Sequence, residues 1–174
     1  MIEAPDPEAI NSFENEAEIR ALSRLAAGRT VLEVGTFNGF SAVLMARAGA
    51  LQVHAVDWHR GGGELGERNT LARCWANLER FGVRDQVVLH VGRSEVVLPL
   101  LRPHSFDLAF IDGGHDRAPQ DTELVLPLMR RGGLIAWHDK DGWEVPRAIA
   151  TAAHVLGVTP TYPGGSIAVV RMPG

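Results

Sequence analysis

The feature that most limits the possible fold is a repeated alternation between two kinds of segment. One kind is a short apolar run, which is typical of a buried strand. The other kind lies between these runs and has apolar residues at spacings of three and four, which is typical of amphipathic helices. A chain that alternates strand and helix in this way is expected to form right-handed crossovers and a parallel α/β sheet covered on both faces. The short runs, rich in β-branched residues and ending at or beside Gly or Asp, are residues 30–34, 52–57, 86–91, 106–112 and 134–138.

The expected helices carry recognisable end signals. Gly82 and Gly157 stand where a helix commonly ends, and Pro146 stands where a first turn tolerates proline. The leading segment has acidic residues early and apolar residues later, which suits the helix dipole, and it is expected to serve as a partial lid. The predicted helices are residues 12–27, 71–81, 124–129 and 145–156.

The end of the chain departs from the strand–helix alternation. Residues 159–162 and 166–172 have strand-like composition, and Pro163-Gly164-Gly165 between them predicts the turn of an antiparallel hairpin added to the sheet. One glycine-rich stretch, Gly61-Gly62-Gly63, follows the second expected strand and is expected to be flexible.

Composition limits the class of protein. A length of 174 residues predicts a single domain over 1–174, and a net charge of −4 excludes a broad basic surface for nucleic acid. Cys74 is the only cysteine, which favours a reducing compartment. The acidic, proline-interrupted N-terminus does not resemble a signal peptide, and no apolar run approaches the roughly 20 residues that span a bilayer. We expect a cytoplasmic protein that binds neither membranes nor nucleic acid.

Ligands of an open parallel sheet bind beyond the carboxyl ends of its strands. The first expected strand leads into Gly35 and Gly39, which allow a tight turn, and the second ends in Asp57, whose carboxylate can accept both hydroxyls of a ribose. Dinucleotide sites share this logic but favour G-x-G-x-x-G, and here no glycine stands at Phe37. Glu33, just before the turn, suits a cationic ligand better than a diphosphate.

These residues carry a family resemblance. Val31-Leu32-Glu33-Val34-Gly35-Thr36-Phe37-Asn38-Gly39 resembles motif I of the class I S-adenosylmethionine-dependent methyltransferases, and Asp57 matches their ribose-binding acid. The segments around Ile111-Asp112-Gly113-Gly114-His115 and Gly132-Gly133-Leu134-Ile135-Ala136-Trp137-His138-Asp139 resemble a small-molecule subgroup related to catechol-type O-methyltransferases. The resemblance extends over residues 30–145.

The resemblance implies a Rossmann-like class I methyltransferase sandwich, a mostly parallel seven-stranded sheet in the order 3-2-1-4-5-7-6 with strand 7 antiparallel. It also implies S-adenosyl-L-methionine as the cofactor, with the segment at residues 90–94 bordering its adenine. The expected cofactor-binding residues are Glu33, Gly35, Thr36, Phe37, Gly39, Ser41, Asp57, Trp58, Arg93, Ser94 and Asp112.

A second group of candidates lies at the ends of the fourth and fifth expected strands. Since adjacent strands are about 4.8 Å apart, Asp112, His115, His138 and Asp139 can converge and hold a divalent cation of the Mg, Mn or Fe class. In catechol-type and caffeoyl-coenzyme-A-type enzymes an acid and an Asp-Asn pair at these positions hold a metal, whereas this chain has His138-Asp139. The resemblance also places a base at His115.

Purely structural roles remain possible for these residues. Asp112 could order water and the following helix without any ion, His138 could bond to the backbone, and His115 could be only a positioning donor. With the cation, Asp112, His138 and Asp139 are the expected ligands, and His115, Asp112 and His138 are the expected catalytic residues.

The sequence thus predicts a methyltransferase acting on a small molecule, at a hydroxyl oxygen, with a divalent cation such as Mg²⁺ as an optional second cofactor. Three alternatives remain: an N- or C-methyltransferase, a metal-dependent hydroxylase-like relative, and a non-catalytic module that binds S-adenosylmethionine. Because the chain offers little material for a lid, we expect a homodimer, or a different partner protein, to complete the acceptor pocket.

Overall fold

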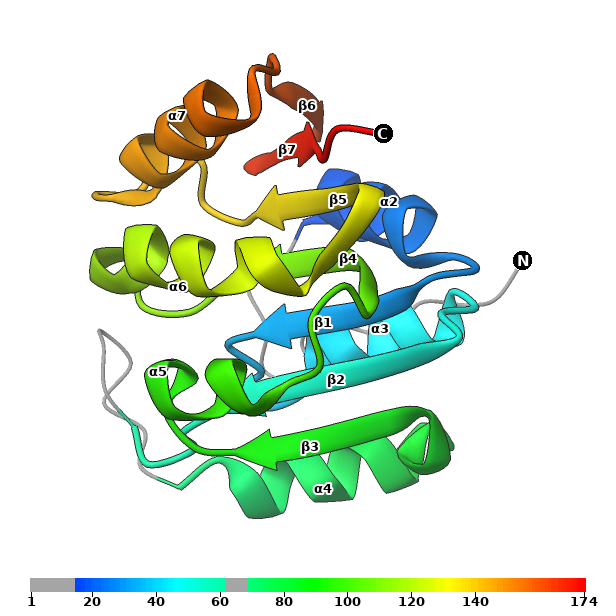
Figure 1. Ribbon diagram of the computed structural model, residues 1–174. Coiled ribbons are helices and arrows are strands. Elements are labelled where there is room, and N and C mark those ends of the chain that lie inside the picture. The colour runs from blue at the N-terminus through cyan, green and yellow to red at the C-terminus, as the bar shows by residue number, and fades with distance from the viewer. Residues whose placement is uncertain (1–14, 62–68) are drawn as a thin grey trace.

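The computed structural model describes residues 15–61 and 69–174. Within them, seven strands form one sheet in the order β3-β2-β1-β4-β5-β7-β6 (Figure 1). The pairs from β3 to β5 are parallel, while β7 is antiparallel to both β5 and β6. The predicted fold class and strand order are therefore confirmed. The strands are β1 (Thr30–Val34), β2 (Gln52–Asp57), β3 (Val87–Val91), β4 (Phe106–Ile111), β5 (Met129–Trp137), β6 (Thr161–Gly164) and β7 (Ile167–Arg171).

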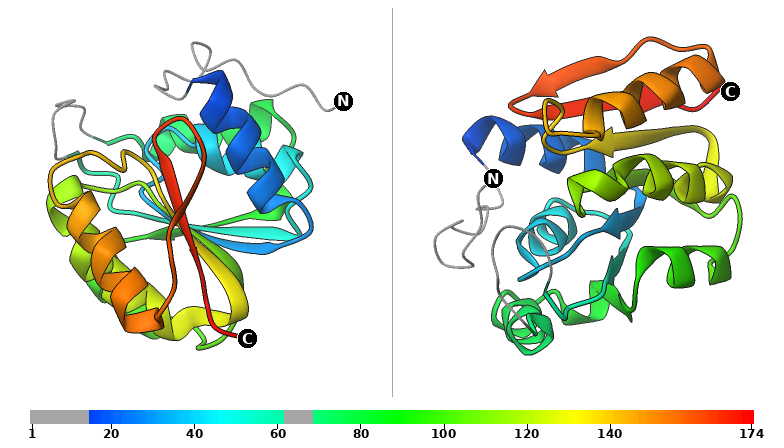
Figure 2. Two further views of the ribbon diagram at one scale, coloured as in Figure 1. Left: turned by 90° about the horizontal axis from the view of Figure 1, so that it is seen from above. Right: turned by 90° about the vertical axis from the view of Figure 1, so that its left-hand side faces the viewer.

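Helices cover both faces of this sheet, as apolar strands with no polar face require. Figure 2 shows α2 and α3 on one side of the sheet and α6 and α7 on the other. Each face has its own apolar core: Leu22, Val43 and Leu78 belong to one, and Val125 and Ala148 to the other. The α-helices are α2 (Glu16–Ala26), α3 (Phe40–Arg47), α4 (Leu71–Arg80), α5 (Ser94–Val97), α6 (Ala118–Val125) and α7 (Val145–Leu156), with short 3₁₀ turns at Arg84–Gln86, Leu98–Leu100, His115–Arg117 and Leu126–Leu128.

The end signals of the helices act as predicted at three positions. Gly82 and Gly157 follow α4 and α7 with φ of +67° and +66°, a left-handed conformation that costs glycine little. Pro146 lies in the first turn of α7, where its missing N–H has no partner to lose. Within the described residues, no helix has the length and apolar character needed to cross a bilayer.

Several predicted boundaries are wrong. The leading helix begins at Glu16 rather than at residue 12, because Asn15 caps it: the Asn15 side chain accepts the N–H groups of Ala17 and Glu18. Residues 12–14 lie outside the described part of the chain, as do Gly62 and Gly63 of the glycine stretch. Met129, expected in a helix, instead begins β5, since Leu126–Leu128 tighten into a 3₁₀ turn that redirects the chain.

The C-terminal hairpin exists, but its turn lies later than predicted. Strand β6 includes Gly164, and the chain reverses at Gly165 and Ser166. Gly165 has a φ of +57°, and the N–H of Ser166 donates to a carboxylate oxygen of Glu18 at 2.8 Å. This contact with α2 stabilises the turn at Ser166 and could not be inferred from the local sequence.

Candidate active site

The polar residues predicted at the strand ends lie at one edge of the sheet. Loops from β1, β2 and β3 form one half of this edge, and loops from β4 and β5 form the other half. Because all five strands are parallel, their carboxyl ends share this edge. The two predicted groups of site residues are therefore neighbours in space.

Glu33 is fully buried on β1 and organises the first loop. The hydroxyl of Thr36 bonds to one of its carboxyl oxygens at 2.9 Å, and the hydroxyl of Ser41 bonds to the other. Burial raises the pKa of Glu33 to about 8, against the lowering effect of these hydroxyls. Glu33 is inaccessible in this structure and acts on the loop through Thr36 and Ser41. Its contact with a cationic ligand stays a prediction from the sequence.

Asp57 connects the loops that follow β1 and β2. One carboxylate oxygen accepts the N–H groups of Thr36 and Phe37 at 2.8 and 2.7 Å, and the other accepts the N–H of His59 at 2.6 Å. A carboxylate has about four acceptor positions. These bonds therefore leave about one position for a ribose hydroxyl, not the two that the sequence prediction assumed.

Gly35 joins the two halves of the site. It has a φ of +94°, and a Cβ at this position would lie 2.3 Å from the carbonyl oxygen of Asp112. The N–H of Asp112 in turn donates to Val34 at 2.8 Å. Gly39 lies in the same loop as Gly35, has a φ of +88° and is the N-cap of α3, and a Cβ there would lie 3.0 Å from the Sγ atom of Cys74 on α4. Only glycine permits this close approach of the two loops.

The rim at the end of β2 is apolar and cationic. Trp58 is 40% exposed, and the centre of its ring lies 5.2 Å from the guanidinium carbon of Arg60 and 5.0 Å from that of Arg93. Ser94 donates its hydroxyl to the buried carboxylate of Asp121, which fixes the loop after β3 to α6. A cavity of about 410 Å³ opens here, lined by Trp58, His59, Arg60, Asn69, Leu71 and Val91.

The other half of the edge contains a compact acid–imidazole cluster. The Nδ1 atom of His138 lies 3.2 Å from a carboxylate oxygen of Asp112 and 3.2 Å from one of Asp139. Burial disfavours the imidazolium, but the two carboxylates outweigh it and raise the pKa of His138 to about 11. The hydrogen bond from His138 in turn lowers the pKa of Asp139 to about 2. His138 therefore carries a proton near neutral pH and is a poor general base.

His115 completes this cluster and is better placed to act as a base. Its Nε2 atom lies 3.0 Å from a carboxylate oxygen of Asp139, and its side chain is 36% exposed. When Nε2 donates to Asp139, Nδ1 is left as the basic nitrogen. Gly142 packs so closely on the ring that a Cβ there would lie 3.0 Å from it.

The cluster has the donor set of a cation site. One ligand atom from each of Asp112, His138 and Asp139 can be chosen so that all lie within 4.8 Å of one another. A divalent cation beside Nδ1 of His138 would balance the same two carboxylate charges that raise the pKa of His138. These residues fit a divalent cation, and the nitrogen donor makes the set suit transition metals as well as Mg²⁺.

The sequence reasoning missed two residues at this edge. Asn38 is 1% exposed, and neither polar atom of its side chain has a hydrogen-bond partner among the described residues. Glu18 of α2 lies 3.5 Å from Nε2 of His138. A capping-box pattern, Asn15-x-x-Glu18, was readable in the sequence, but nothing in it showed the contact with His138.

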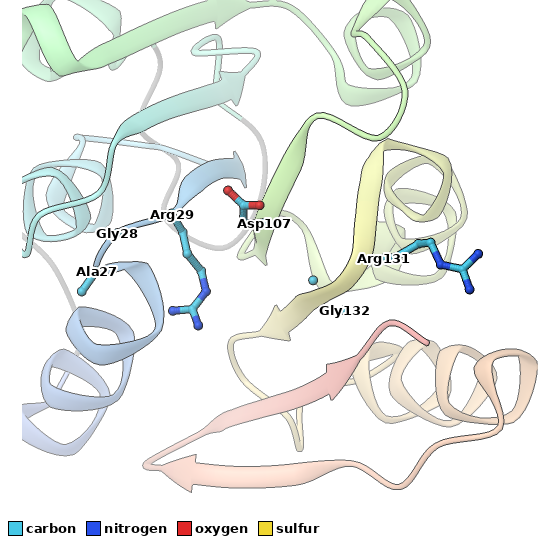
Figure 3. A pocket seen from close by; sticks show the side chains of 7 residues that line it. Ala27, Gly28, Arg29, Asp107, Arg131 and Gly132 are labelled. Carbon is cyan, nitrogen blue, oxygen red and sulfur yellow. The ribbon is translucent and has the colours of Figure 1, made fainter. Parts of the chain in front are cut away.

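A second cavity lies at the opposite, amino-terminal edge of the strands (Figure 3). Its charged groups already have partners: Asp107 pairs with Arg130 at 2.7 Å, and Arg29 donates to the carbonyl of Leu25 at 2.6 Å. Arg131 extends away from Asp107 in Figure 3. This cavity therefore does not present the free charged groups of a reactive site. The cavity measures about 320 Å³ and is lined by Ala27, Gly28, Arg29, Asp107, Arg131, Gly132 and Gly133.

The fold and this edge together define a class of protein. A doubly covered sheet with this strand order, a glycine turn after β1 and an acid at the end of β2 are the features of the class I, Rossmann-like methyltransferase fold. The chain belongs to the methyltransferase domain family, whose family model matches residues 32–140. The resemblance inferred from the motifs is thus confirmed at the level of family and fold.

Individual relatives agree with this assignment. A catechol O-methyltransferase of Mycobacterium tuberculosis is 36% identical over 107 residues, covering 62% of this chain and 46% of that protein. A caffeoyl-CoA O-methyltransferase of Populus kitakamiensis is 30% identical over 124 residues, covering 67% and 48%. The chain therefore spans about half the length of these relatives. The O-methyltransferase of Bacillus cereus, solved in complex with SAH, has the same fold, with a TM-score of 0.70, 19% identity and coverage of 91% and 82%.

Proposed function

We propose that this chain transfers a methyl group from S-adenosylmethionine to a hydroxyl oxygen of a small-molecule acceptor. The observation that carries the proposal is the contact between Gly35 and Asp112, which places the glycine loop directly beside the acid–imidazole cluster. A donor held by the loop and an acceptor held by the cluster would then meet at one point, as an in-line displacement requires. The relatives named as O-methyltransferases support oxygen as the acceptor atom.

The half of the site formed by the loops after β1, β2 and β3 would hold the methyl donor, through the backbone of the glycine loop and through the side chains at its rim. The loop from Gly35 to Gly39 would carry the amino acid portion, with Asp57 accepting one ribose hydroxyl and Trp58 bordering the adenine. S-adenosylmethionine, when bound there, supplies an electrophilic methyl group on a positively charged sulfur, and the acceptor oxygen bonds to that carbon as the C–S bond breaks. Glu33 and Ser41 would act indirectly, by keeping the loop in shape.

The acceptor half would bind and deprotonate the hydroxyl. His115 would take the acceptor proton on Nδ1 while Asp139 fixes its ring. Asp112, His138 and Asp139 would hold a divalent cation, which supplies positive charge that favours the acceptor oxyanion. Asp112 would thus contribute to both halves, because its backbone contacts the loop and its side chain faces His138.

The proposal extends to assembly. Helix α2 lies over the hairpin end of the sheet and would cover only part of the acceptor side (Figure 2). We propose that a second copy of the chain supplies the remaining cover. Light scattering at micromolar concentration should then give twice the mass of the chain, and a monomer would contradict this part of the proposal.

The test is turnover with a labelled donor. Purified protein is incubated with methyl-labelled S-adenosylmethionine and a panel of catechols, phenols, amines and carbon acids, with and without a chelator. Label should move to a hydroxyl acceptor, and His115→Gln should lose most of this activity while still binding S-adenosylhomocysteine. Binding of the donor product without turnover on any acceptor would favour a non-catalytic module, and label only on nitrogen or carbon would refute O-methylation.

A further inference from the structure

Glu18 is a buried carboxylate directed at the cation cluster from a different part of the fold. It lies on α2, its side chain is 5% exposed, and one of its oxygens is 3.5 Å from Nε2 of His138. That nitrogen is buried and has no hydrogen-bond partner within the described residues. A buried polar atom without a partner is rare, so its carboxylate neighbour calls for a functional explanation.

Three other donors hold this carboxylate in place. The N–H and hydroxyl of Ser166 donate to one oxygen at 2.8 and 2.7 Å, and the N–H of Asn15 donates to the other at 2.8 Å. The bonds come from the hairpin turn and from the start of α2, so both segments must be in place to fix Glu18. An acceptor-only group held this rigidly favours a proton on the Nε2 atom that it faces.

We propose that Glu18 is the positioning residue that prepares His138 as a metal ligand, and that the resulting Nδ1 donor shifts the site from Mg²⁺ toward transition cations. A histidine that ligates a metal through one nitrogen usually donates its other N–H to a carboxylate, which sets the tautomer and the ring orientation. Here Nδ1 faces Asp112 and Asp139, and Nε2 faces Glu18. The inference rests on the cation in the proposed function.

The nature of the donors decides the preference. Oxygen donors alone suit Mg²⁺, whereas an imidazole nitrogen suits Zn²⁺, Fe²⁺ and their neighbours. With two carboxylates and one imidazole, the cluster should bind Co²⁺ and Zn²⁺ in strong preference to Mg²⁺. Replacing the imidazole by an amide oxygen should reduce that preference.

The substitution Glu18→Gln tests the positioning role sharply. Two donors from Ser166 face one carboxylate oxygen and one donor, the N–H of Asn15, faces the other, so the new amide should keep its carbonyl at Ser166. Its NH₂ group then takes the place of the oxygen that faces His138, and the N–H of Asn15 loses its acceptor. The NH₂ group donates to Nε2, which favours a proton on Nδ1 and blocks the ligand atom. Glu16→Gln is the matched control, because it removes an acid from the same helix at an exposed position.

The readout is the visible spectrum and affinity of Co²⁺, followed by competition with Mg²⁺. Glu18→Gln should weaken Co²⁺ binding by about 10- to 100-fold, Glu16→Gln should leave it unchanged, and the ratio of Co²⁺ to Mg²⁺ affinity should fall in His138→Asn. In the His138→Asn background, Glu18→Gln should have no further effect on Co²⁺, since Glu18 acts through the ring. Nitrogen NMR of the Zn²⁺-loaded protein should show a proton on Nε2 of His138.

The inference would be overturned if Glu18→Gln bound Co²⁺ as tightly as the unchanged protein, or if Glu18→Gln caused an equal loss of Co²⁺ affinity in both backgrounds. An unchanged ratio of Co²⁺ to Mg²⁺ affinity in His138→Asn would also overturn it. Absence of Co²⁺ and Zn²⁺ binding at millimolar concentration would also overturn it. Methyl transfer by chelator-treated protein is scored separately, so a failure of this inference is distinguishable from a failure of the proposed function.

Discussion

Replacing Glu33 by glutamine should remove a large part of the pH dependence of stability. Glu33 is fully buried, and its pKa is raised to about 8 from the ordinary value of 4.5 because burial disfavours the charged form. Near neutral pH the folded protein therefore holds this proton, while the unfolded chain releases it. The amide of Glu33→Gln has nearly the same shape, can still bond to Thr36 and Ser41, and does not titrate.

The sign and size follow from proton linkage. For an acid whose pKa is raised in the fold, stability is full below the unfolded pKa and falls as pH rises toward the folded pKa. Each pH unit in this interval removes about 1.4 kcal/mol, so the contribution of Glu33 should fall by roughly 4 kcal/mol between about pH 5 and pH 8. Above the folded pKa the dependence due to Glu33 should end, because both states are then ionised.

The assay is urea unfolding of the unchanged protein and the variant over this pH range. As the pH rises from about 5 to 8, the free energy of unfolding of the unchanged protein should fall relative to that of Glu33→Gln. Glu16→Gln is the control: its carboxylate is 86% exposed, so its curve should stay parallel to that of the unchanged protein. Parallel curves for Glu33→Gln would refute the reasoning, as would a carboxyl ¹³C titration of Glu33 with a midpoint near 4.5.

Three further substitutions test the site. Gly35→Ala should lower the free energy of unfolding by about 3 kcal/mol or more, because its Cβ would collide with the carbonyl of Asp112. The control Gly49→Ala, which has a similar φ of +92° but open space around it, should lower it by only about 1–2 kcal/mol. Equal losses of stability in thermal unfolding would count against the close contact. His115→Gln should lower kcat about 100-fold without changing the affinity for S-adenosylhomocysteine, and an unchanged kcat would remove His115 as the base. Asp57→Ala should weaken calorimetric binding of S-adenosylhomocysteine about tenfold or more, because the loop loses its acceptor.

The overall fold could be predicted from the sequence because its signals are local. The apolar runs of β1 and β2 end where the pattern places them, and Gly82 and Gly157 mark helix ends through a backbone conformation that glycine adopts freely. The strand order came from the resemblance to a family rather than from periodicity, which does not determine the order of strands in a sheet. The convergence of Asp112 with His138 follows from the pairing of neighbouring strands.

The remaining features depend on contacts between distant parts of the chain. Glu18 can be read from the sequence as an acid at the start of a helix, but its partners Ser166 and His138 lie far along the sequence. The hairpin turn shares Gly165 with the Pro-Gly-Gly signal, and its other residue, Ser166, is held by that contact. The bonds of Glu33 to the loop depend on its complete burial, which raises the pKa of its carboxyl group and cannot be read from the sequence.

The most direct test of the account is a crystal structure of the chain with bound S-adenosylhomocysteine. The account predicts the nucleoside along the loop of residues 35–39, a ribose hydroxyl on Asp57, and the sulfur directed toward Asp112 and His115. A nucleoside bound elsewhere, or no bound nucleoside at saturating concentration, would contradict it.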